Sequence, residues 1–420
     1  MNPGPIETGR SSNPKEQPPL RRKVLFCSGA VLLSLLSGLV LFELATQLLV
    51  RTGLLMSSRP WASQDRRYVD HQEFGLWRRA NTIFRHPTLK VDYRTNSVGA
   101  RDRERTEMAA SRRIVVLGDS FVEGWNLPTE KRLTNLLENS TGLEHLNFAM
   151  GHFGPYQSYL VYRELGKRYT HDHVLIGVLP INDFIDLDYE QARHAVWYPY
   201  RPYLLGQYPD LRRFDHREGK IKNFLRSHSY GYNALAHGYL HLRADTFDPY
   251  ARPLRNEKGL VQSFFHEFNE QQFLWLRYSL ELLVTAADGK QVVVFLIPAQ
   301  QDFLRHHQSG EGPLYARLSE LGATQGFQVI NLLPRMLRAL PRGQAPWEAY
   351  YFRDDYHWNA RANAVAAKIL QRELRETIYH LPEAGLSTPT SNRPQSADKR
   401  DLPRDQNHGN KDLNENFSPD

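Results

Sequence analysis

Residues 114–124 read IVVLGDSFVEG, in which an apolar run leads directly into Gly118, Asp119 and Ser120. A glycine, an acid and a hydroxyl after apolar residues are most often a plain turn. The same residues also fit a second interpretation, in which a nucleophilic serine stands at the carboxyl end of a buried parallel strand. The rest of the sequence must decide between the turn and the reactive site.

Five apolar runs alternate with amphipathic segments along the chain. The runs are continuous, which is typical of parallel strands that are covered on both faces. The expected strands are residues 112–120, 143–151, 173–183, 291–299 and 327–334, and the expected helices are residues 129–142, 155–169, 271–290, 314–326 and 359–378. This rhythm predicts an α/β protein with a three-layer α/β/α architecture around a doubly wound parallel sheet.

An uncharged segment near the amino terminus, residues 24–42, is long enough to cross a membrane. It follows the basic cluster RRK at residues 21–23. A membrane span needs about 20 apolar residues, whereas the apolar core of a signal peptide has only about 7 to 15. We therefore expect one transmembrane helix, an uncleaved anchor at residues 24–50. Because basic residues favour the cytoplasmic side, residues 1–23 are expected in the cytoplasm and the rest in the periplasm or outside the cell.

Shifts in composition divide the rest of the chain. Residues 51–89 read as a linker and lead-in, and residues 90–380 as the main domain. An insertion at about residues 186–262 is rich in Tyr, Arg and Pro, is too long for a simple connection, and contains an expected helix at residues 223–243. We expect it to form a subdomain or lid whose aromatic rings either stack on sugars or pack a small core of their own. Residues 385–420 lack apolar periodicity and are expected to be disordered.

Charge and cysteine content argue against several classes of site. The net charge is +7, but basic and acidic residues alternate, as in RDRERTEMAASRR at residues 101–113. There is no basic stripe with stacking aromatics, so nucleic-acid binding is not expected. Cys27 is the single cysteine, which excludes an intrachain disulfide framework and a cysteine-based metal cluster. No metal and no other cofactor is expected.

Polar residues follow the expected strands at the edge of the sheet where ligands gather. Ser120 follows the first strand, Gly151 the second and Asn182 the third, while His357 precedes the last helix. A serine needs a general base to become a nucleophile, and His357 is the candidate. The backbone N–H groups of Ser120 and Gly151 and the side-chain amide of Asn182 are expected to stabilise an oxyanion. These groups together predict an acyl-transfer site.

Two neighbouring acids precede His357. Counting three residues back selects Asp354 as the acid that orients the imidazole, and Asp355 is expected to point away from it. The alternative is that both acids only cap the turn before the helix that begins near Asn359. Each motif alone is usually structural, and the order of the motifs at the strand ends favours the catalytic interpretation.

The motifs resemble those of the SGNH hydrolase superfamily, the GDSL-type esterases and acyl hydrolases. Its four blocks are matched in order by GDSF at Ser120, NFAMG at Gly151, IND at Asn182 and DDYH at residues 354–357. The resemblance covers roughly residues 90–380. It implies a flavodoxin-like SGNH fold and a catalytic triad of Ser120, His357 and Asp354.

The resemblance extends to one further stretch and departs from the family pattern in two places, one of which is the continuation of the first block as FVEG at residues 121–124, a variant common in anchored members. NSVGARD, residues 96–102, is similar to a stretch that precedes the first block in membrane-anchored bacterial members. Pro180 stands where the third block of the family usually has glycine, a departure that narrows the site without removing a catalytic group.

Three functions remain open from the sequence. The first is a membrane-anchored esterase that hydrolyses O-acyl or O-acetyl esters through an acyl-enzyme on Ser120. The second is an O-acyltransferase that uses the same residues on envelope polysaccharide, and the third is a catalytically silent module that binds glycan. The expected partners are an acylated small molecule or glycan and the lipid bilayer, and the sequence identifies no protein partner.

Overall fold

The computed structural model describes residues 20–55, 60, 68–85, 91–192, 201–215, 220–244, 255–353 and 355–380. Its centre is a five-stranded parallel sheet in the order β11-β10-β7-β5-β6. The strands are β5 (Arg113–Leu117), β6 (Glu144–Asn147), β7 (His173–Val178), β10 (Gln291–Leu296) and β11 (Phe327–Asn331). All five lie within the expected runs, and the predicted parallel α/β sheet is confirmed.

The order in which the strands are added to the sheet reverses direction at β5. From β5 the chain moves to β6 on one side and then returns to β7 on the other side. This is the flavodoxin-like order, and its switch point lies between the first and third strands of the sheet. Residues 114–117 of β5 are fully buried, so the segment after this strand emerges from the middle of the core.

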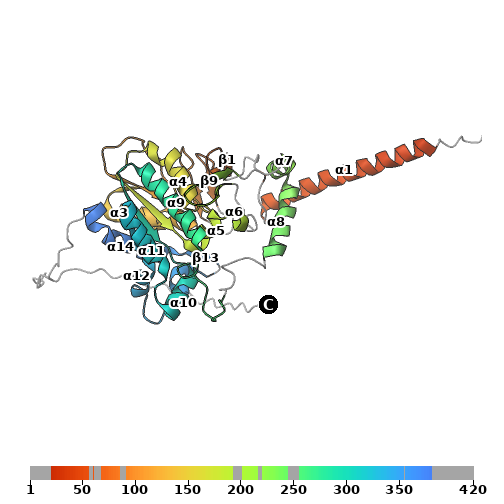
Figure 1. Cartoon of the computed structure of the whole chain (residues 1–420). Helices are drawn as coiled ribbons and strands as arrows, with labels where there is room; N and C mark the ends of the chain where they lie inside the picture. The colour runs from red at the N-terminus through yellow and green to blue at the C-terminus, as the bar shows by residue number, and fades with distance from the viewer. Residues whose placement is uncertain are drawn as a thin grey trace, which may run out of the picture. The chain divides into compact units, whose positions relative to one another are not determined.

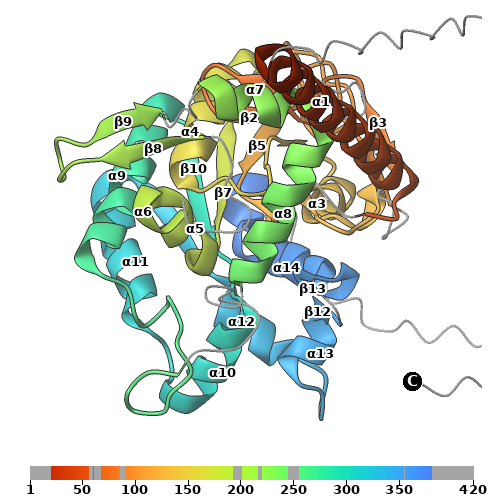
Figure 2. The ribbon, with the colours of Figure 1, turned by 90° about the vertical axis from the view of Figure 1, so that its right-hand side faces the viewer.

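Helices cover both faces of the sheet. On one face α3 (Leu133–Thr141) packs against α14 (Ala360–Glu373), and on the other α4 (Pro155–Glu164) packs against α9 (Glu270–Ala287). In Figure 2, α9 and α11 (Pro313–Gln325) lie on the left of the sheet and α3 and α14 on its right. The three-layer arrangement predicted from the sequence is therefore present.

The remaining elements complete the main domain and the segments around it. Short helices are α2 (Ser120–Glu123), α5 (Pro180–Leu187), α6 (Tyr189–Ala192), α10 (Gln300–Ser309), α12 (Leu332–Arg338) and α13 (Pro346–Tyr350), with 3-10 turns at Thr129–Lys131 and Gly166–Arg168 and a π-helical turn at Arg375–Tyr379. Antiparallel pairs are β1 (Tyr68–His71) with β2 (Gly75–Arg78), β3 (Ile83–Arg85) with β4 (Asp92–Arg94), β8 (Pro202–Leu205) with β9 (Arg212–Asp215), and β12 (Tyr351–Phe352) with β13 (Asp355–Trp358).

Two helices cover the stretch of the insertion, residues 223–243, that the sequence predicts as one helix. They are α7 (Lys220–His228) and α8 (Tyr230–Ala244), and Ser229 separates them. The Ser229 hydroxyl oxygen accepts the N–H of Tyr232 at 2.9 Å, so it caps the start of α8 and ends the expected continuous helix.

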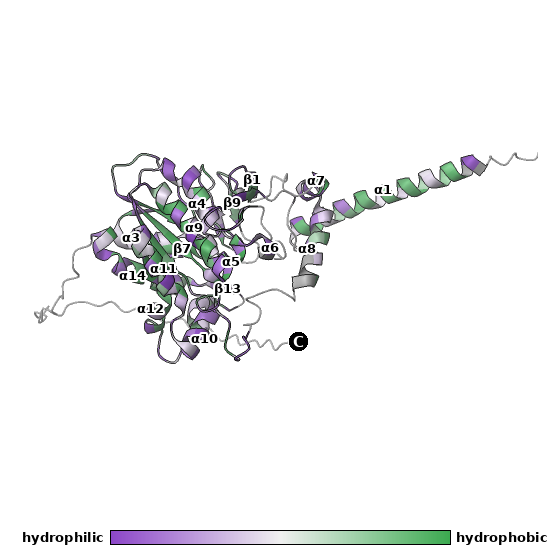
Figure 3. Cartoon of the chain, viewed as in Figure 1, coloured by the Kyte–Doolittle hydropathy of each residue, from purple (hydrophilic) through white to green (hydrophobic). Residues whose placement is uncertain are grey.

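The amino-terminal helix α1 (Leu20–Thr52) contains residues 24–50, the segment that the sequence predicts as a membrane anchor. Residues 24–52 form a helix long and apolar enough to cross a membrane, and none of its most apolar window is buried. Figure 1 labels this helix, and Figure 3 shows hydrophobic colouring along most of its length. Residues 1–19 and the expected disordered tail, residues 385–420, lie outside the described residues.

Candidate active site

A sharp strand-to-helix turn presents Ser120. Ser120 is the first residue of α2, directly after β5, and Asp119 caps the helix by accepting the N–H of Phe121 at 2.9 Å. Gly118 has φ +145°, and a Cβ there would lie 2.6 Å from Cγ2 of Val122. Only glycine fits this turn. The path of the backbone therefore accounts for the glycine and the capping acid of the GDS motif, and it brings Ser120 to the switch point of the sheet.

The imidazole of His357 lies within hydrogen-bonding distance of Ser120. Its Nε2 is 2.8 Å from Ser120 Oγ, and both residues are almost fully buried. The rings of Phe121 and Tyr356 lie against the imidazole, at centroid distances of 5.1 and 4.7 Å. These contacts hold the imidazole beside the Ser120 hydroxyl, which is the arrangement that a serine acyl-transfer site requires.

The acid beside His357 is Asp355, which corrects the expectation that Asp354 holds this position. Oδ1 of Asp355 is 2.5 Å from Nδ1 of His357 and also accepts the N–H of His357 at 3.0 Å. Both residues belong to strand β13, where side chains two positions apart point to the same face. The expected three-residue spacing assumed that these residues form a turn, whereas residues 355–358 form a strand. Asp354 itself lies outside the described residues.

Asn126 fixes the second oxygen of Asp355. Its side-chain amide donates to Oδ2 of Asp355, and its own N–H donates to the Tyr93 hydroxyl at 2.9 Å. Burial acts to raise the pKa of Asp355, but the hydrogen bonds and charge of His357 and the amide of Asn126 outweigh it and lower the pKa. The carboxylate is therefore ionised at neutral pH and accepts the Nδ1–H of His357. Sequence reasoning missed Asn126, because no motif links residue 126 to residue 355.

Two of the three expected oxyanion donors have other hydrogen-bond partners. As the first residue of α2, Ser120 has an N–H with no acceptor inside the helix. Gly151 lies beside it, because a Cβ on Gly151 would be 3.5 Å from Ser120 Cβ, but its N–H donates to Glu123 Oε2 at 2.7 Å. Asn182 donates to Asp119 at 3.2 Å. The oxyanion roles of Gly151 and Asn182 remain predictions that require these bonds to be exchanged.

A buried ion pair supports the turn that carries Gly151. Oε2 of Glu123 lies 2.5 Å from the guanidinium of Arg78, with both side chains almost fully buried. Arg78 also donates to the carbonyl of Ala149, at 3.2 and 3.3 Å. Burial acts to raise the pKa of Glu123, but the charges of Arg78 and Arg101 and the N–H of Gly151 lower it overall. Glu123 and Arg78 were not identified from the sequence.

The NSVGARD stretch supports the loop after the nucleophile. The guanidinium of Arg101 donates to the carbonyls of Gly124 and Leu127, both at 2.6 Å. Gly99 has φ +80°, and a Cβ there would lie 2.4 Å from the carbonyl oxygen of Arg78. The motif therefore has a structural role beneath the site, and its backbone approaches Arg78 too closely for any residue but glycine.

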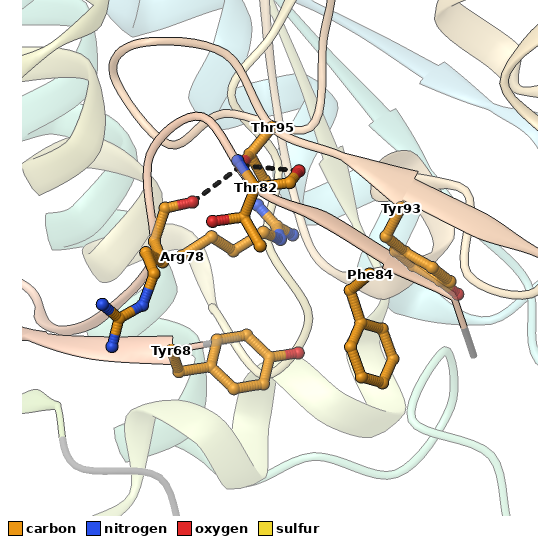
Figure 4. A pocket seen from close by; sticks show the side chains of 7 residues that line it. Tyr68, Arg78, Thr82, Phe84, Tyr93 and Thr95 are labelled. Atoms are coloured by element: carbon orange, nitrogen blue, oxygen red, sulfur yellow. Dashed lines mark hydrogen bonds between the residues drawn. The ribbon is translucent and has the colours of Figure 1, made fainter. Parts of the chain in front are cut away.

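A small pocket shares residues with this supporting layer. It is lined by Tyr68, Arg78, Arg79, Thr82, Phe84, Tyr93 and Thr95. Figure 4 shows Tyr68, Phe84 and Tyr93 on one side of it and the hydrogen-bonded pair Thr82 and Thr95 on the other. Tyr93 and Arg78 are the residues that hold Asn126 and Glu123. The pocket therefore borders the residues that support Asp355 and the turn at Gly151.

Three acids of the site region, Asp119, Asp183 and Asp186, are wholly or partly buried. Burial raises the pKa of Asp119, Asp183 and Asp186. Asp183 accepts the N–H of Leu179 at 2.7 Å, and Asp186 pairs with the guanidinium of Arg201 at 2.6 Å. These bonds hold α5, and with it Asn182, against the end of β7. Within the described residues, no group of three or more His, Cys, Asp or Glu side chains is arranged to hold a metal ion.

Comparison with known families supports the relationship suggested by the motifs. A family model described as an SGNH hydrolase-like domain of the acetyltransferase AlgX matches residues 282–408. The match includes β10, β11 and the Asp355–His357 pair, whereas Ser120 precedes it. A search among curated proteins found no match.

Several solved structures align with the chain at low sequence identity. A member of the G-D-S-L lipolytic family from Veillonella parvula is 12% identical, with 62% of this chain and 97% of that chain covered and a TM-score of 0.31. A lipase/acylhydrolase from Enterococcus faecalis is 14% identical, with 63% and 96% covered and a TM-score of 0.33. An acetyl xylan esterase from Butyrivibrio proteoclasticus is 10% identical, with 65% and 66% covered and a TM-score of 0.32.

Proposed function

We propose that this protein, a member of the SGNH hydrolase superfamily, is a membrane-anchored serine enzyme that cleaves O-acyl esters through an acyl-enzyme on Ser120. The observation that carries the proposal is the continuous chain of contacts from Ser120 Oγ through His357 to Asp355, at 2.8 and 2.5 Å. An isolated cap or turn has no need of such a chain. The catalytic domain is proposed to span residues 90–380, with the insertion at about residues 186–262.

The geometry supports a two-step reaction. Ser120 Oγ attacks the ester carbonyl carbon while Nε2 of His357 accepts the hydroxyl proton, and the Asp355 carboxylate stabilises the imidazolium that forms. The tetrahedral intermediate collapses as His357 gives this proton to the leaving alcohol, which leaves the acyl group on Ser120. Water or another hydroxyl then attacks the acyl-enzyme, loses its proton to His357, and restores the Ser120 hydroxyl when the intermediate collapses.

The second step determines whether the enzyme is an esterase or an acyltransferase. We propose hydrolysis, with O-acetyl groups on a glycan as the substrate class. The matched family model carries the name of an acetyltransferase, which favours O-acyl transfer to an envelope polysaccharide as the second candidate. Both reactions use the same three residues, because only the attacking hydroxyl differs.

Mass spectrometry of the products distinguishes these candidates. The purified full chain is incubated with a panel of O-acetylated oligosaccharides, acetylated xylan among them, with and without an unacetylated acceptor labelled by a heavy isotope. Hydrolysis releases acetate whether or not acceptor is present, whereas transfer moves the acetyl group to the labelled acceptor. The Ser120→Ala protein is the control for both. Absence of both products in the wild type across the panel would favour the silent glycan-binding module and contradict the proposed enzyme.

The proposed location places the catalytic domain on the far side of the membrane from residues 1–23. An alkaline phosphatase reporter fused after residue 385 is therefore expected to be active, because the phosphatase becomes active only outside the cytoplasm. The matched control is the same reporter fused after residue 23, before the span, which is expected to be inactive. An inactive fusion at residue 385, or a mature chain that lacks residues 1–50, would contradict the anchor.

A further inference from the structure

Two helices of the insertion leave apolar side chains uncovered. On α7 the exposed fractions are 79% for Ile221 and 62% for Phe224, and on α8 they are 65% for Leu235, 54% for Tyr239 and 85% for Leu242. The spacings of three and four residues place these side chains on one side of each helix. A group of exposed apolar residues of this kind marks an interaction surface.

The two helices form one unit, called here the α7–α8 hairpin, residues 220–244. The side-chain amide of Asn233 on α8 donates to the carbonyls of Arg226 and Ser229, both at 2.9 Å. The end of α7 and the first turns of α8 are therefore fastened together, and the exposed side chains of both helices belong to the same rigid piece.

The hairpin is attached to the proposed membrane anchor. Glu43 of α1 caps α8: its Oε1 accepts the N–H of Tyr230 at 2.6 Å, and its Oε2 accepts the Ser229 hydroxyl at 2.7 Å and the N–H of Gly231 at 3.0 Å. The guanidinium of Arg51 lies over the Tyr230 ring, 5.8 Å from its centroid. In Figures 1 and 2 the hairpin lies beside the carboxyl-terminal part of α1.

The position of Glu43 along α1 indicates where the α7–α8 hairpin lies relative to the bilayer. From Val24 to Glu43 a helix rises about 30 Å, which is about the thickness of the hydrocarbon core of a bilayer. Glu43 therefore lies at the outer edge of that core when α1 spans the membrane. Burying a carboxylate in the hydrocarbon core costs free energy. The Glu43 carboxylate accepts three hydrogen bonds from the start of α8, and such an arrangement is compatible with the interfacial region of the bilayer. The start of α8 is thereby fixed at the membrane surface.

The charges of the hairpin also suit a lipid surface. Residues 220–244 include Lys220, Lys222, Arg226 and Arg243 and contain no Asp or Glu. Basic residues next to exposed apolar side chains are typical of helices that lie in the interface of a membrane with anionic lipids.

We propose that the α7–α8 hairpin is a second membrane contact, which inserts the side chains of Ile221, Phe224, Leu235, Tyr239 and Leu242 into the interfacial layer of the bilayer. The proposal rests on the anchor proposed above, and its partner is the lipid surface, with anionic headgroups preferred. Through this contact, the insertion would hold the catalytic domain close to the membrane.

Site-specific fluorescence on the reconstituted full chain tests this contact. With Cys27→Ser as background, single cysteines at Phe224 and Leu242 are labelled with an environment-sensitive fluorophore. The protein is placed in phosphatidylcholine vesicles with and without phosphatidylglycerol. Both labels are expected to shift to shorter wavelengths and to be quenched at least about twofold more by shallow nitroxide lipids than a control label at Met108, which is an exposed apolar residue outside the hairpin (75% exposed). Phosphatidylglycerol is expected to increase the quenching.

A label at Val31 within α1 separates this inference from the anchor on which it rests. Quenching of the Val31 label by deep nitroxide lipids, with hairpin labels that stay in water, would overturn the second contact alone. That result would instead favour a protein partner for the exposed face. A Val31 label that no lipid quenches would contradict the anchor, and the hairpin inference with it.

Discussion

Replacing Ser120 with alanine is expected to lower kcat/KM for a small chromogenic acetyl ester by at least about 10³-fold. The Oγ atom is the only nucleophile that lies 2.8 Å from His357 Nε2 in the site described above, and without it no acyl-enzyme forms. The structure around residue 120 should be preserved, because the cap by Asp119 and the φ of Gly118 do not depend on the hydroxyl. The measurement is steady-state hydrolysis by the purified variant.

A melting curve of the same preparation distinguishes loss of chemistry from loss of fold. Ser140→Ala is a matched control, because the Ser140 hydroxyl donates only to the carbonyl of Leu137, one turn earlier in α3. Its activity and its melting temperature should stay close to those of the wild type. Substantial hydrolysis by the folded Ser120→Ala protein would contradict the serine mechanism.

Asp355→Asn is expected to lower kcat by about 10³- to 10⁴-fold with little change in KM. An amide at this position donates to Nδ1 of His357 and thus forces the imidazole proton onto Nε2, where it blocks proton transfer from Ser120. The matched control is Asp354→Asn, which changes the neighbouring acid in the same way and is expected to change kcat little. Equal losses in the two variants would contradict the assignment of Asp355.

The lowered pKa of Asp355 also predicts that the stability lost in Asp355→Asn depends on pH. Because the folded state lowers the pKa of Asp355, this carboxylate stabilises the fold above its ordinary pKa, and that contribution is lost as the pH falls. The melting temperature of Asp355→Asn should therefore lie further below the wild type at about pH 7 than at about pH 3. A difference that does not change with pH would indicate that the residue acts only through packing.

The sheet, and the proximity of Ser120 and His357 at its edge, follow from the sequence for a clear physical reason. Parallel strands buried on both faces must be continuously apolar, so β5, β7 and β10 are visible as runs. Their carboxyl ends share one edge of the sheet, which places Ser120 near the polar residues of the other strand ends. His357 is recognisable because it precedes a helix that packs on the same sheet.

The acid of the proposed triad could not be predicted by counting residues. Whether Asp354 or Asp355 meets the imidazole depends on the conformation of two or three residues, and the two-residue repeat of a short strand selects Asp355. Asn126 and the Arg78–Glu123 pair depend on contacts between distant segments, which leave no periodic signal in the sequence.

Peptide mapping after fluorophosphonate labelling tests the central claim most directly. The reagent reacts with a serine that an adjacent base has activated, and it leaves a stable phosphonyl group on the attacking oxygen. The wild-type chain should carry one adduct, on Ser120, and the adduct should form far more slowly in Asp355→Asn but at nearly the wild-type rate in Asp354→Asn. An adduct on another residue, or ester turnover by a protein that takes up no label at Ser120, would contradict the proposed acyl-enzyme.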